Sequence, residues 1–399
     1  MLIKIDNTIV GFIRNNILTL NTLSPEILAL NHIADAYREG DHLVVADVEV
    51  LEFLTRCILL NNSTRLIYEH LKNRIYSFGA YESLLTCYIL VHKKDITFNR
   101  MTISNVCHFE VPLERLSKRM CLAPTFLVSE HQSDCEFYIK IAKRYISEIV
   151  TFNGINIKME TILGGGDSSS LVYKYHISQG KICLAIADSD KSYPHDQIGD
   201  TLLGLQQVFQ DYKYSHIIDL YALDVREKEN LVSPSVYLMC TNSSCRVTLK
   251  KLYEIEMSEH REKLKYIDIK GGLNAKSYLT ADSNWLEYYE ILFKEKSDLL
   301  NCGIDEICTK DEKYVLIDGI GGYLRYVEYE ILDGKLEDIL NKKIALKIPQ
   351  DVIDKINKDV ERSKSLFSHL PDYLQEEWKS ISEKILAWGC CSPEGVFNT

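Results

Sequence analysis

The sequences TFLVSE at residues 125–130 and ICLAIADSD at residues 182–190 decide the fold class. Each opens with an uninterrupted apolar run of strand length and ends at carboxylates, Glu130 in the first and Asp188 and Asp190 in the second. Such runs are typical of strands buried on both faces of a parallel sheet. Ligands of open α/β sheets bind outside the carboxyl ends of the strands. We therefore expect the three acids at one sheet edge, where they suit a hard cation such as Mg²⁺ or Mn²⁺.

The residues around these two runs alternate between helical and extended patterns. Apolar side chains recur every four residues over 134–149, which predicts a helix, and 155–159 is a short apolar run. Three glycines at 164–166 predict a turn before a second helix over 168–177, and a further strand is expected over 216–223. The resulting β-α-β-α-β pattern predicts an α/β fold with a parallel sheet flanked by helices.

Composition sets limits on the class of protein. The 399 residues are 46% hydrophobic and 26% charged, as in ordinary globular proteins, and suffice for two or three domains. The formal net charge of -11 argues against a chain coated with nucleic acid but permits a local basic groove. Because the chain has no signal-peptide pattern, no long apolar stretch and only scattered cysteines, we expect a cytoplasmic protein with reduced thiols and no membrane contact.

Three consecutive domains are predicted. Residues 1–120 are expected to form a mostly helical domain for oligomerisation or regulation, with helices over 47–60, 64–77 and 80–92. Residues 121–235 form the central α/β domain. Residues 236–399 are expected to form a mixed α/β extension. Its expected parts are helices over 249–264, 281–300, 351–366 and 371–387, a strand and turn over 266–272, a hairpin around 315–329 and an irregular tail at 390–393.

The central domain resembles a Toprim domain, the catalytic fold shared by topoisomerases, primases and nucleases of the OLD type. The resemblance covers residues 122–235 and rests on Glu130 after the first strand, the triple glycine, and the Asp-Ser-Asp of residues 188–190 after the third strand. The version nearest to this chain has a second acid four residues after the glutamate, matched by Asp134. It also has an Arg-x-x-Glu-Asn element, matched by residues 226–230. The chain departs from the family at His131, where glycine is usual.

The resemblance implies roles for particular side chains. Glu130, Asp188 and Asp190 would be catalytic and would bind Mg²⁺ or Mn²⁺, and Asp134 or Glu229 would support a second ion. Divalent cations neutralise the charge that builds on a phosphodiester during cleavage and activate the attacking water. Lys270 is the candidate for electrostatic complementation of that charge, with Lys191 and Lys228 as alternatives. Contacts to nucleic acid are expected from His131, Lys191, Arg226 and Lys228.

The leading hypothesis is a metal-dependent endonuclease acting on DNA, messenger RNA or tRNA. Standalone Toprim nucleases of this kind belong to bacterial anti-phage or abortive-infection systems, so the resemblance implies a defence role. The sequence has no Gly-x4-Gly-Lys-Ser/Thr, so any ATPase partner has to be a separate chain. A homo-oligomer is also expected, because most oligomers are built from identical chains.

Two alternatives come from other classes of protein. Arg65 and His70 have the Arg-x4-6-His spacing of helical HEPN ribonucleases, although Leu66 stands where a polar residue is usual. In the second alternative, the chain is a catalytically silent nucleic-acid-binding or regulatory subunit, and its strand-end acids only cap helices or face solvent. The cysteines do not favour a zinc site, because no two of them have the Cys-x2-Cys spacing.

Overall fold

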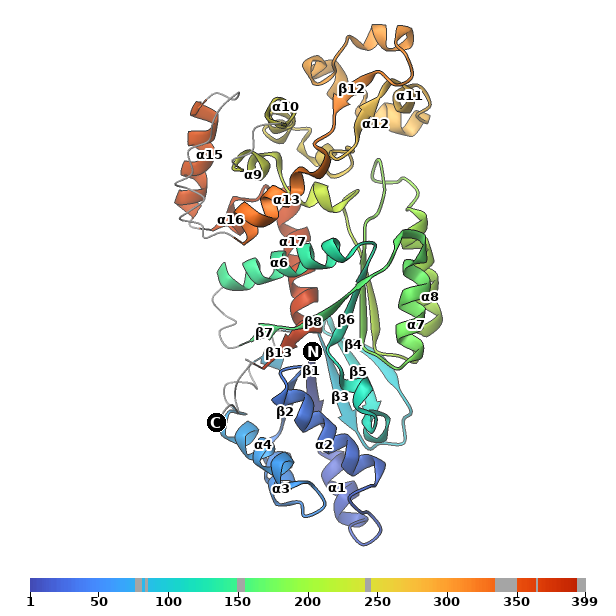
Figure 1. Ribbon diagram of the computed structural model, residues 1–399, viewed down its shortest axis with the longest axis vertical. Coiled ribbons are helices and arrows are strands. Elements are labelled where there is room, and N and C mark those ends of the chain that lie inside the picture. Colours follow the sequence, from blue (N-terminus) through green and yellow to red (C-terminus); the bar gives the residue numbers. More distant parts are fainter. Residues whose placement is uncertain are drawn as a thin grey trace. The chain divides into compact units, whose positions relative to one another are not determined.

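The computed structural model describes residues 1–75, 81–82, 85–148, 155–240, 245–333, 350–363 and 365–392 (Figure 1). The chain forms two compact units, which do not coincide with the three consecutive domains expected from the sequence. The first unit consists of Met1–Ala187, Leu203–Tyr221 and Ile381–Thr399, and the second of Asp188–Leu202 and Ala222–Ser380. Within the described residues, the helices are too short or too polar to cross a membrane.

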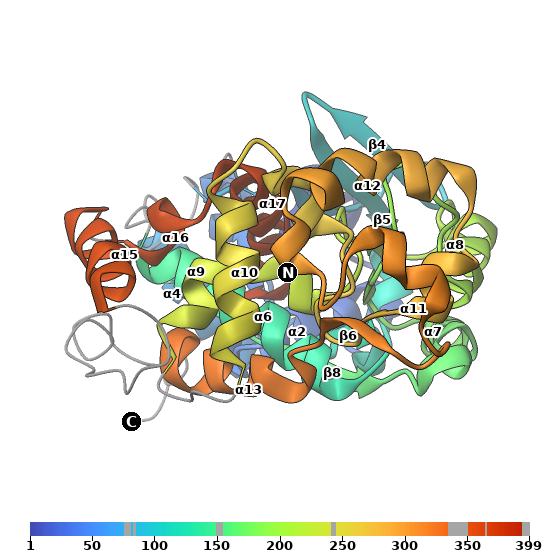
Figure 2. The same cartoon turned by 90° about the horizontal axis from the view of Figure 1, so that it is seen from above.

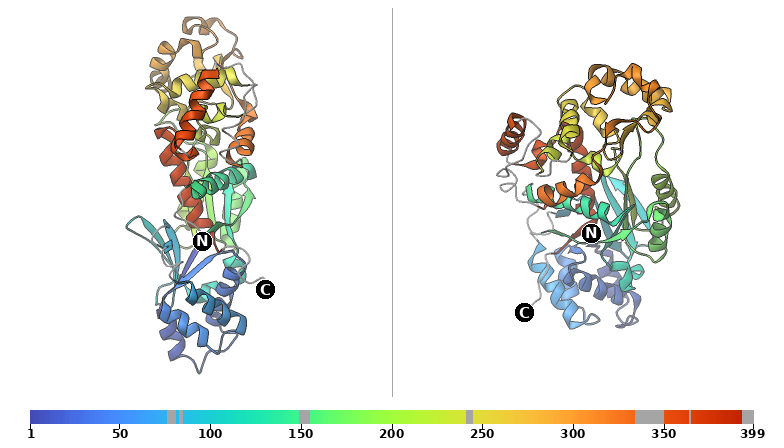
Figure 3. Two further views of the ribbon diagram at one scale, coloured as in Figure 1. Left: turned by 90° about the vertical axis from the view of Figure 1, so that its left-hand side faces the viewer. Right: turned by 45° about the horizontal axis from the view of Figure 1, so that its top comes forward.

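The first unit begins with a five-stranded sheet. Its strands are β1 (Leu2–Ile5), β2 (Leu43–Ala46), β3 (Cys87–His92), β4 (Asn99–Ile103) and β5 (Val106–Pro112), in the order β2-β1-β3-β5-β4. All pairs are parallel except the antiparallel pair of β4 with β5. The helices are α1 (Thr8–Asn15), α2 (Pro25–Arg38), α3 (Val48–Arg56) and α4 (Asn62–Asn73), shown in blue in Figures 1 and 3.

This sheet corrects the prediction of a mostly helical domain over residues 1–120. The helices expected over 47–60 and 64–77 correspond to α3 and α4, but the helix expected over 80–92 is wrong, because Cys87–His92 is strand β3. The strand is buried along nearly its whole length and pairs on both sides, so its continuous apolar pattern reflects a central strand. Residues 76, 77, 80, 83 and 84 of the expected helices lie outside the described residues.

The second sheet of this unit has the predicted β-α-β-α-β order, but the strand expected over 155–159 is misplaced, because Met159–Leu163 is the strand of this sheet and Asn156–Ile157 pairs in another sheet. Its strands are β6 (Thr125–Ser129), β8 (Met159–Leu163), β9 (Cys183–Ala187) and β10 (Ile218–Ala222), in the order β10-β9-β6-β8. Strand β6 is parallel to both β8 and β9. The connecting helices are α6 (Gln132–Glu148), α7 (Ser169–Ser178) and α8 (Asp200–Tyr212). Figure 1 shows α7 and α8 side by side on one face of the sheet and α6 on the other.

The chain returns to the first unit at its carboxyl end. The last turns of α17 (Asp372–Gly389) lead into β13 (Cys390–Cys391), which pairs antiparallel with β7 (Asn156–Ile157). The tail expected to be irregular is therefore a strand up to Cys391, and Pro393 lies outside the described residues. Cys390 and Cys391 are both buried, so this pair of apolar side chains belongs to the core and not to a surface loop.

The second unit consists mainly of short helices. These are α9 (Pro234–Leu238), α10 (Arg246–Glu256), α11 (Ala275–Leu279), α12 (Ser283–Glu295), α13 (Leu324–Val327), α15 (Gln350–Ser363) and α16 (Leu366–His369). Figure 2 shows α9 beside α10. Strand β11 (Gly272–Asn274) pairs antiparallel with β12 (Val315–Asp318). The hairpin expected around 315–329 is thus wrong, because β12 pairs with an earlier strand and the chain turns helical from Gly321.

Short helices of other types complete both units. In the first unit they are Leu113–Leu116, Arg119–Leu122 and Gly166–Ser168. In the second they are η5 (Lys228–Leu231), η6 (Arg261–Lys265), Ser297–Leu299, Ile304–Thr309, Gly321–Tyr323 and the π-helical turn Glu328–Leu332.

A buried carboxyl group lies between α9 and α10. Glu256, 8% exposed, accepts hydrogen bonds from the main-chain nitrogen of Ser235 (2.8 Å) and from its Oγ (2.7 Å). Burial raises the pKa of Glu256 to about 7, and the two hydrogen bonds only partly offset this effect. Because an unfolded glutamate has a pKa of about 4.3, the folded protein binds more protons than the unfolded chain between these pH values. The contribution of this group to stability therefore falls as the pH rises from about 4 to 7.

We expect Glu256→Gln to stabilise the protein relative to wild type at pH 8. The amide keeps the shape of the side chain but cannot ionise. The unfolding free energy of the variant minus that of wild type should therefore rise by about 2–3 kcal/mol between pH 5 and pH 8. Urea denaturation at both pH values measures this shift. Glu254→Gln, at a half-exposed position of the same helix, is the control and should show no such change. A pH-independent difference for Glu256→Gln would contradict the raised pKa.

Candidate functional site

The predicted glycine turn lies against Glu130 in the first unit. The main-chain nitrogens of Gly164 and Gly165 donate hydrogen bonds to the main-chain oxygens of Ser129 and Glu130, each at 3.0 Å. A Cβ on Gly164 would lie 2.2 Å from that Ser129 oxygen, so no larger residue fits without movement. Gly165 and Gly166 have φ values of 78° and 60°, which glycine adopts without strain. The three glycines thus fix the main chain at Glu130.

Replacement of Gly164 by alanine is expected to destabilise the first unit by about 1–3 kcal/mol, the usual cost of overpacking. The new methyl group would collide with the Ser169 side chain and with the main-chain oxygen of Ser129, which cannot rotate away as a side chain can. Thermal or urea denaturation measures the loss. Gly11→Ala is the matched control, because Gly11 lies in α1 with open space around it and alanine is the better helix former. Equal stability of the two variants would disprove the close approach.

Asp134 and His131 lie at the start of α6. The Oδ2 atom of Asp134 accepts a hydrogen bond from the main-chain nitrogen of His131 (2.8 Å), and its Oδ1 accepts one from Ser133 Oγ (3.3 Å). Asp134 is 4% exposed, and its bond to the nitrogen of His131, the residue directly before α6, is the bond that an acid in the first turn makes in a capping box. The exposed His131 ring lies 3.8 Å from Glu130 Oε1. The metal role of Asp134 and the phosphate role of His131 stay predictions.

The Asp-Ser-Asp loop that follows β9 begins the second unit and is tied to a later segment. Ser189 Oγ donates a hydrogen bond to the main-chain oxygen of Val225 (2.7 Å), and the main-chain nitrogen of Asp190 donates one to that of Arg226 (2.9 Å). Asp190 has a φ of 57°, in the left-handed region that aspartate tolerates better than most residues. A Cβ on Gly199 would lie 1.9 Å from Asp190 Oδ2, so the Asp190 side chain lies directly against Gly199 and a larger residue there would displace it. The hydrogen bonds to residues 225 and 226 hold the main chain of this loop in a defined position.

Glu229 and Lys270, predicted independently from the sequence, come together in the second unit. Lys270 Nζ lies 3.5 Å from Glu229 Oε1, and Glu229 is 4% exposed. Burial lowers the pKa of the Lys270 amine, but the carboxylates of Glu229, Glu227 and Asp188 outweigh it, so that the pKa is raised. The amine is therefore a protonated cation at neutral pH.

Two buried carboxylate oxygens near this lysine lack hydrogen bonds. Within the described part of the chain, Glu229 Oε2 and Glu227 Oε2 have no hydrogen-bond partner. Burial, with Asp268 and Glu229 nearby, raises the pKa of Glu227. Buried anionic oxygens without donors are costly unless a cation approaches them. Oxygen atoms of this kind are the ligands that Mg²⁺ and Mn²⁺ prefer, so the donor set fits such an ion.

The segment that carries these acids is held by Asn230. Its side-chain nitrogen donates hydrogen bonds to the main-chain oxygens of Leu264 and Ile267, both at 2.8 Å. Its Oδ1 accepts a hydrogen bond from the main-chain nitrogen of Glu227 (3.2 Å), in a capping box that starts η5. Asn230 thus connects η5 to the chain that leads to Lys270. The predicted Arg-x-x-Glu-Asn element is a short helical turn with a structural asparagine.

The structure places the predicted site residues in both units. Those in the first unit are Glu130, His131 and Asp134; those in the second are Asp188, Asp190, Lys191, Arg226, Lys228, Glu229 and Lys270. Lys191 and Lys228 are half-exposed. Sequence reasoning missed Glu227, although it lies inside the predicted element. Comparison of the chain with protein-family models, curated proteins and solved structures gives no match.

A separate group of side chains also went unpredicted. Among the described residues, one set of three has ligand atoms all within 4.8 Å of one another: Glu259, His260 and Glu295. His260 Nε2 lies 2.8 Å from Glu295 Oε2, so the histidine already has a carboxylate partner. No sequence signal announces this group, because Glu295 comes from a distant helix, α12.

Proposed function

We propose that the protein is a Toprim-like, divalent-metal-dependent nuclease that uses Glu130, Asp188 and Asp190. The observation that carries the proposal is the pairing of β6 with β9. These strands are parallel neighbours in register through Val128 and Ala185. Glu130 is the residue directly after β6, and Asp188 is the residue directly after β9. The carboxyl edge of such a sheet is where α/β proteins bind ligands.

The chemistry of the second unit supports the same proposal. Mg²⁺ or Mn²⁺, when bound, would neutralise phosphate charge and lower the pKa of a water nucleophile. Glu229 and Glu227 offer buried carboxylate oxygens for such an ion. Lys270 carries a positive charge at neutral pH and would stabilise the negative charge that develops on the phosphate oxygens. The remaining implications of the resemblance, an anti-phage defence role, a separate ATPase partner and a homo-oligomer, belong to this proposal and rest on the resemblance.

A cleavage assay tests the proposal. Purified protein is incubated with plasmid DNA and with total tRNA, in Mg²⁺, in Mn²⁺ or in EDTA. Cleavage that requires the metal and disappears in the Glu130→Gln, Asp188→Asn double variant would support a nuclease and identify its substrate class. Absence of cleavage together with equal Mn²⁺ binding by wild type and double variant in calorimetry would favour the silent binding subunit instead.

The alternative of a helical ribonuclease is less well supported. Arg65 and His70 both lie on α4, but five residues turn an α-helix by about 140° beyond a full turn, so the two side chains leave from different faces. Arg65 donates a hydrogen bond to Asn62, and the His70 ring lies 6.1 Å from that of Tyr37. Burial and the neighbouring Arg74 lower the pKa of His70. The geometry does not pair Arg65 with His70.

A further inference from the structure

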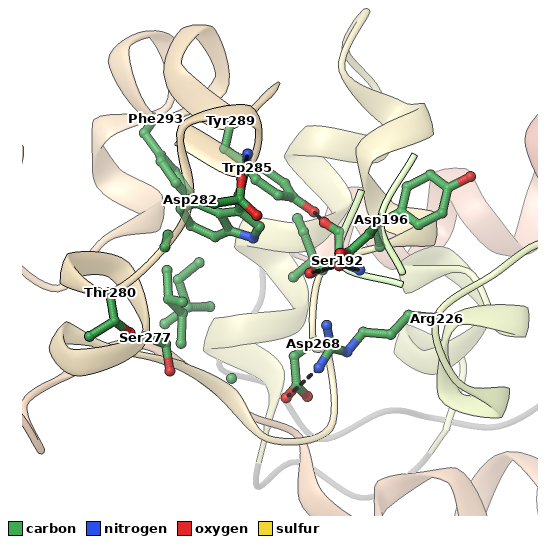
Figure 4. A pocket seen from close by; sticks show the side chains of 16 residues that line it. Ser192, Asp196, Arg226, Asp268, Ser277, Thr280, Asp282, Trp285, Tyr289 and Phe293 are labelled. Carbon is green, nitrogen blue, oxygen red and sulfur yellow. Dashed lines mark hydrogen bonds and ion pairs between the residues drawn. The ribbon is translucent and has the colours of Figure 1, made fainter. Parts of the chain in front are cut away.

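The second unit contains a cavity of about 330 Å³ beside Arg226 (Figure 4). One wall is aromatic and comes from α12. The Trp285 and Tyr289 rings lie 4.7 Å apart, and Tyr289 stacks on Phe293 at 5.6 Å. Tyr289 is 1% exposed and donates a hydrogen bond from its hydroxyl to the main-chain oxygen of Ser192 (3.1 Å). The half-exposed Trp285 therefore packs on the buried Tyr289 and lines the cavity.

A guanidinium group lies on another side of the same cavity. Figure 4 shows Arg226 facing Asp268, at 3.9 Å between Nη2 and Oδ2. Arg226 Nε lies 3.6 Å from Glu227 Oε1 and, among the described residues, has no hydrogen-bond acceptor. Both separations are longer than a hydrogen bond. The guanidinium group therefore retains donor capacity for an anionic ligand, and its planar fork matches a phosphate.

The other acids of the cavity are engaged by the chain itself. Asp196 accepts hydrogen bonds from the main-chain nitrogens of Ser192 (2.9 Å) and Gln197 (2.8 Å). Asp282 Oδ1 accepts one from the main-chain nitrogen of Trp285 (2.8 Å), which caps the start of α12. These bonds fix the loops around the cavity and partly compensate both carboxylates. Arg226 thus remains the group suited to a phosphate.

We propose that this cavity binds one unpaired nucleotide, with its base stacked on Trp285 and its phosphate on Arg226. The volume is at the lower end of the range for small-molecule sites, which suits a single nucleotide. Aromatic side chains stack bases of any sequence, and an arginine adds attraction for the phosphate. A base in a duplex is stacked and paired and cannot enter without being flipped out. The inference rests on the proposed function in one respect: it makes the substrate a single-stranded or locally opened nucleic acid.

The link to the acidic loop supports a role in positioning substrate. The main-chain oxygen of Arg226 accepts the hydrogen bond from Asp190, and its main-chain nitrogen donates one to the main-chain oxygen of Lys265 (2.8 Å). A nucleotide held by the Arg226 side chain is therefore held by the same residue that fixes Asp190. In this arrangement the cavity positions the nucleic-acid strand, and the acids of the proposed nuclease site act on a neighbouring phosphodiester.

Binding measured in EDTA separates this inference from the nuclease proposal. The probes are adenosine monophosphate, a fluorescently labelled single-stranded oligoadenylate, and the same strand annealed to its complement. Fluorescence anisotropy follows the labelled strands, and quenching of tryptophan fluorescence follows the mononucleotide. The quenching reports on Trp285, because Trp378 and Trp388 are fully buried.

We expect Trp285→Ala to weaken binding of the single strand by roughly 5- to 150-fold, the measured range for loss of one base stack. Trp285→Phe should retain most of the affinity and guards against a folding defect. Tyr329→Ala removes an aromatic ring that is 78% exposed and lies outside the cavity lining, so this control should bind as wild type does.

Tighter binding of the oligomer than of the mononucleotide would identify a strand as the source of the nucleotide, and equal affinity would identify a free nucleotide. Equal binding of duplex and single strand, or no effect of Trp285→Ala, would overturn the inference. Metal-dependent cleavage that persists in Trp285→Ala with unchanged strand affinity would reject the cavity alone. Tight, Trp285-dependent binding without cleavage would reject the nuclease alone.

Discussion

Replacement of Asp188 by asparagine is expected to reduce metal-dependent cleavage by at least about 100-fold, because loss even of groups that only support metal ligands costs up to that much. Asparagine keeps the shape of the side chain but removes the negative charge. The change should also lower the pKa of Lys270, since Asp188 is one of the carboxylates that raise it. Initial rates over a Mg²⁺ titration measure the first effect, and the pH dependence of the residual rate measures the second.

A matched exposed aspartate controls for surface charge. Asp305→Asn makes the same chemical change in the second unit, at an exposed position that is not one of the proposed site residues, and this variant should cleave at the wild-type rate. If Asp188→Asn retained the wild-type rate at every Mg²⁺ concentration, Asp188 would have no metal role and the proposed function would lose its central residue. Restoration of the rate at high Mg²⁺ would instead indicate weakened binding of the ion.

Trp388→Ala should cause the largest loss of stability, about 3–5 kcal/mol, the usual cost of removing a buried large aromatic side chain. Trp388 is fully buried and meets Phe109 of β5 edge to face at 5.6 Å. Its main-chain oxygen accepts a hydrogen bond from Thr125 Oγ1 (2.6 Å), at the start of β6. The residue therefore joins both sheets of the first unit. Urea denaturation followed by near-ultraviolet circular dichroism measures the loss.

Trp388→Phe distinguishes packing from hydrogen bonding at the same position. The indole nitrogen is buried and has no acceptor among the described residues, so phenylalanine removes an unsatisfied donor while it keeps an aromatic ring. Its cost should be clearly smaller than that of alanine. Similar losses for the two variants would show that the second ring of the indole, and not aromatic contact with Phe109, carries the stabilisation.

The sequence predicts the central sheet well and the first sheet poorly, for one physical reason. Strands β6 and β9 are continuous apolar runs bounded by acids and glycines, so the sequence pattern itself predicts that they are buried on both faces. Strands β1 and β2 have four residues each, too few for a periodic signal. Strand β3 ends an apolar stretch that is long enough to suggest a helix. Only its pairing with β1, which is distant in sequence, and with β5 makes it a strand.

The candidate site divides in the same way. Motif order singled out Glu229 and Lys270, which the structure brings within 3.5 Å, and their roles stay predictions. Motif order does not distinguish a metal ligand from a helix-capping residue, and Asp134 accepts a hydrogen bond from a main-chain nitrogen at the start of α6, as a capping residue does. Nor does it reveal the aromatic cavity, because Trp285 and Arg226 are far apart in the sequence and line the same cavity only once the second unit has folded. Such groupings depend on tertiary contacts that no local pattern records.

The interleaved chain path has a practical consequence for deletion mapping. The first unit takes its last strand and Trp388 from the carboxyl end, after the chain has passed through the whole of the second unit. A truncated chain ending near residue 235 would therefore lack β13 and expose the edge of β7 and the core around Phe109. Inactivity of such a fragment would be explained by the disrupted hydrophobic core of the first unit. It would not show that the removed segment has a functional role. Genetic dissection of this protein calls for single substitutions in the intact chain.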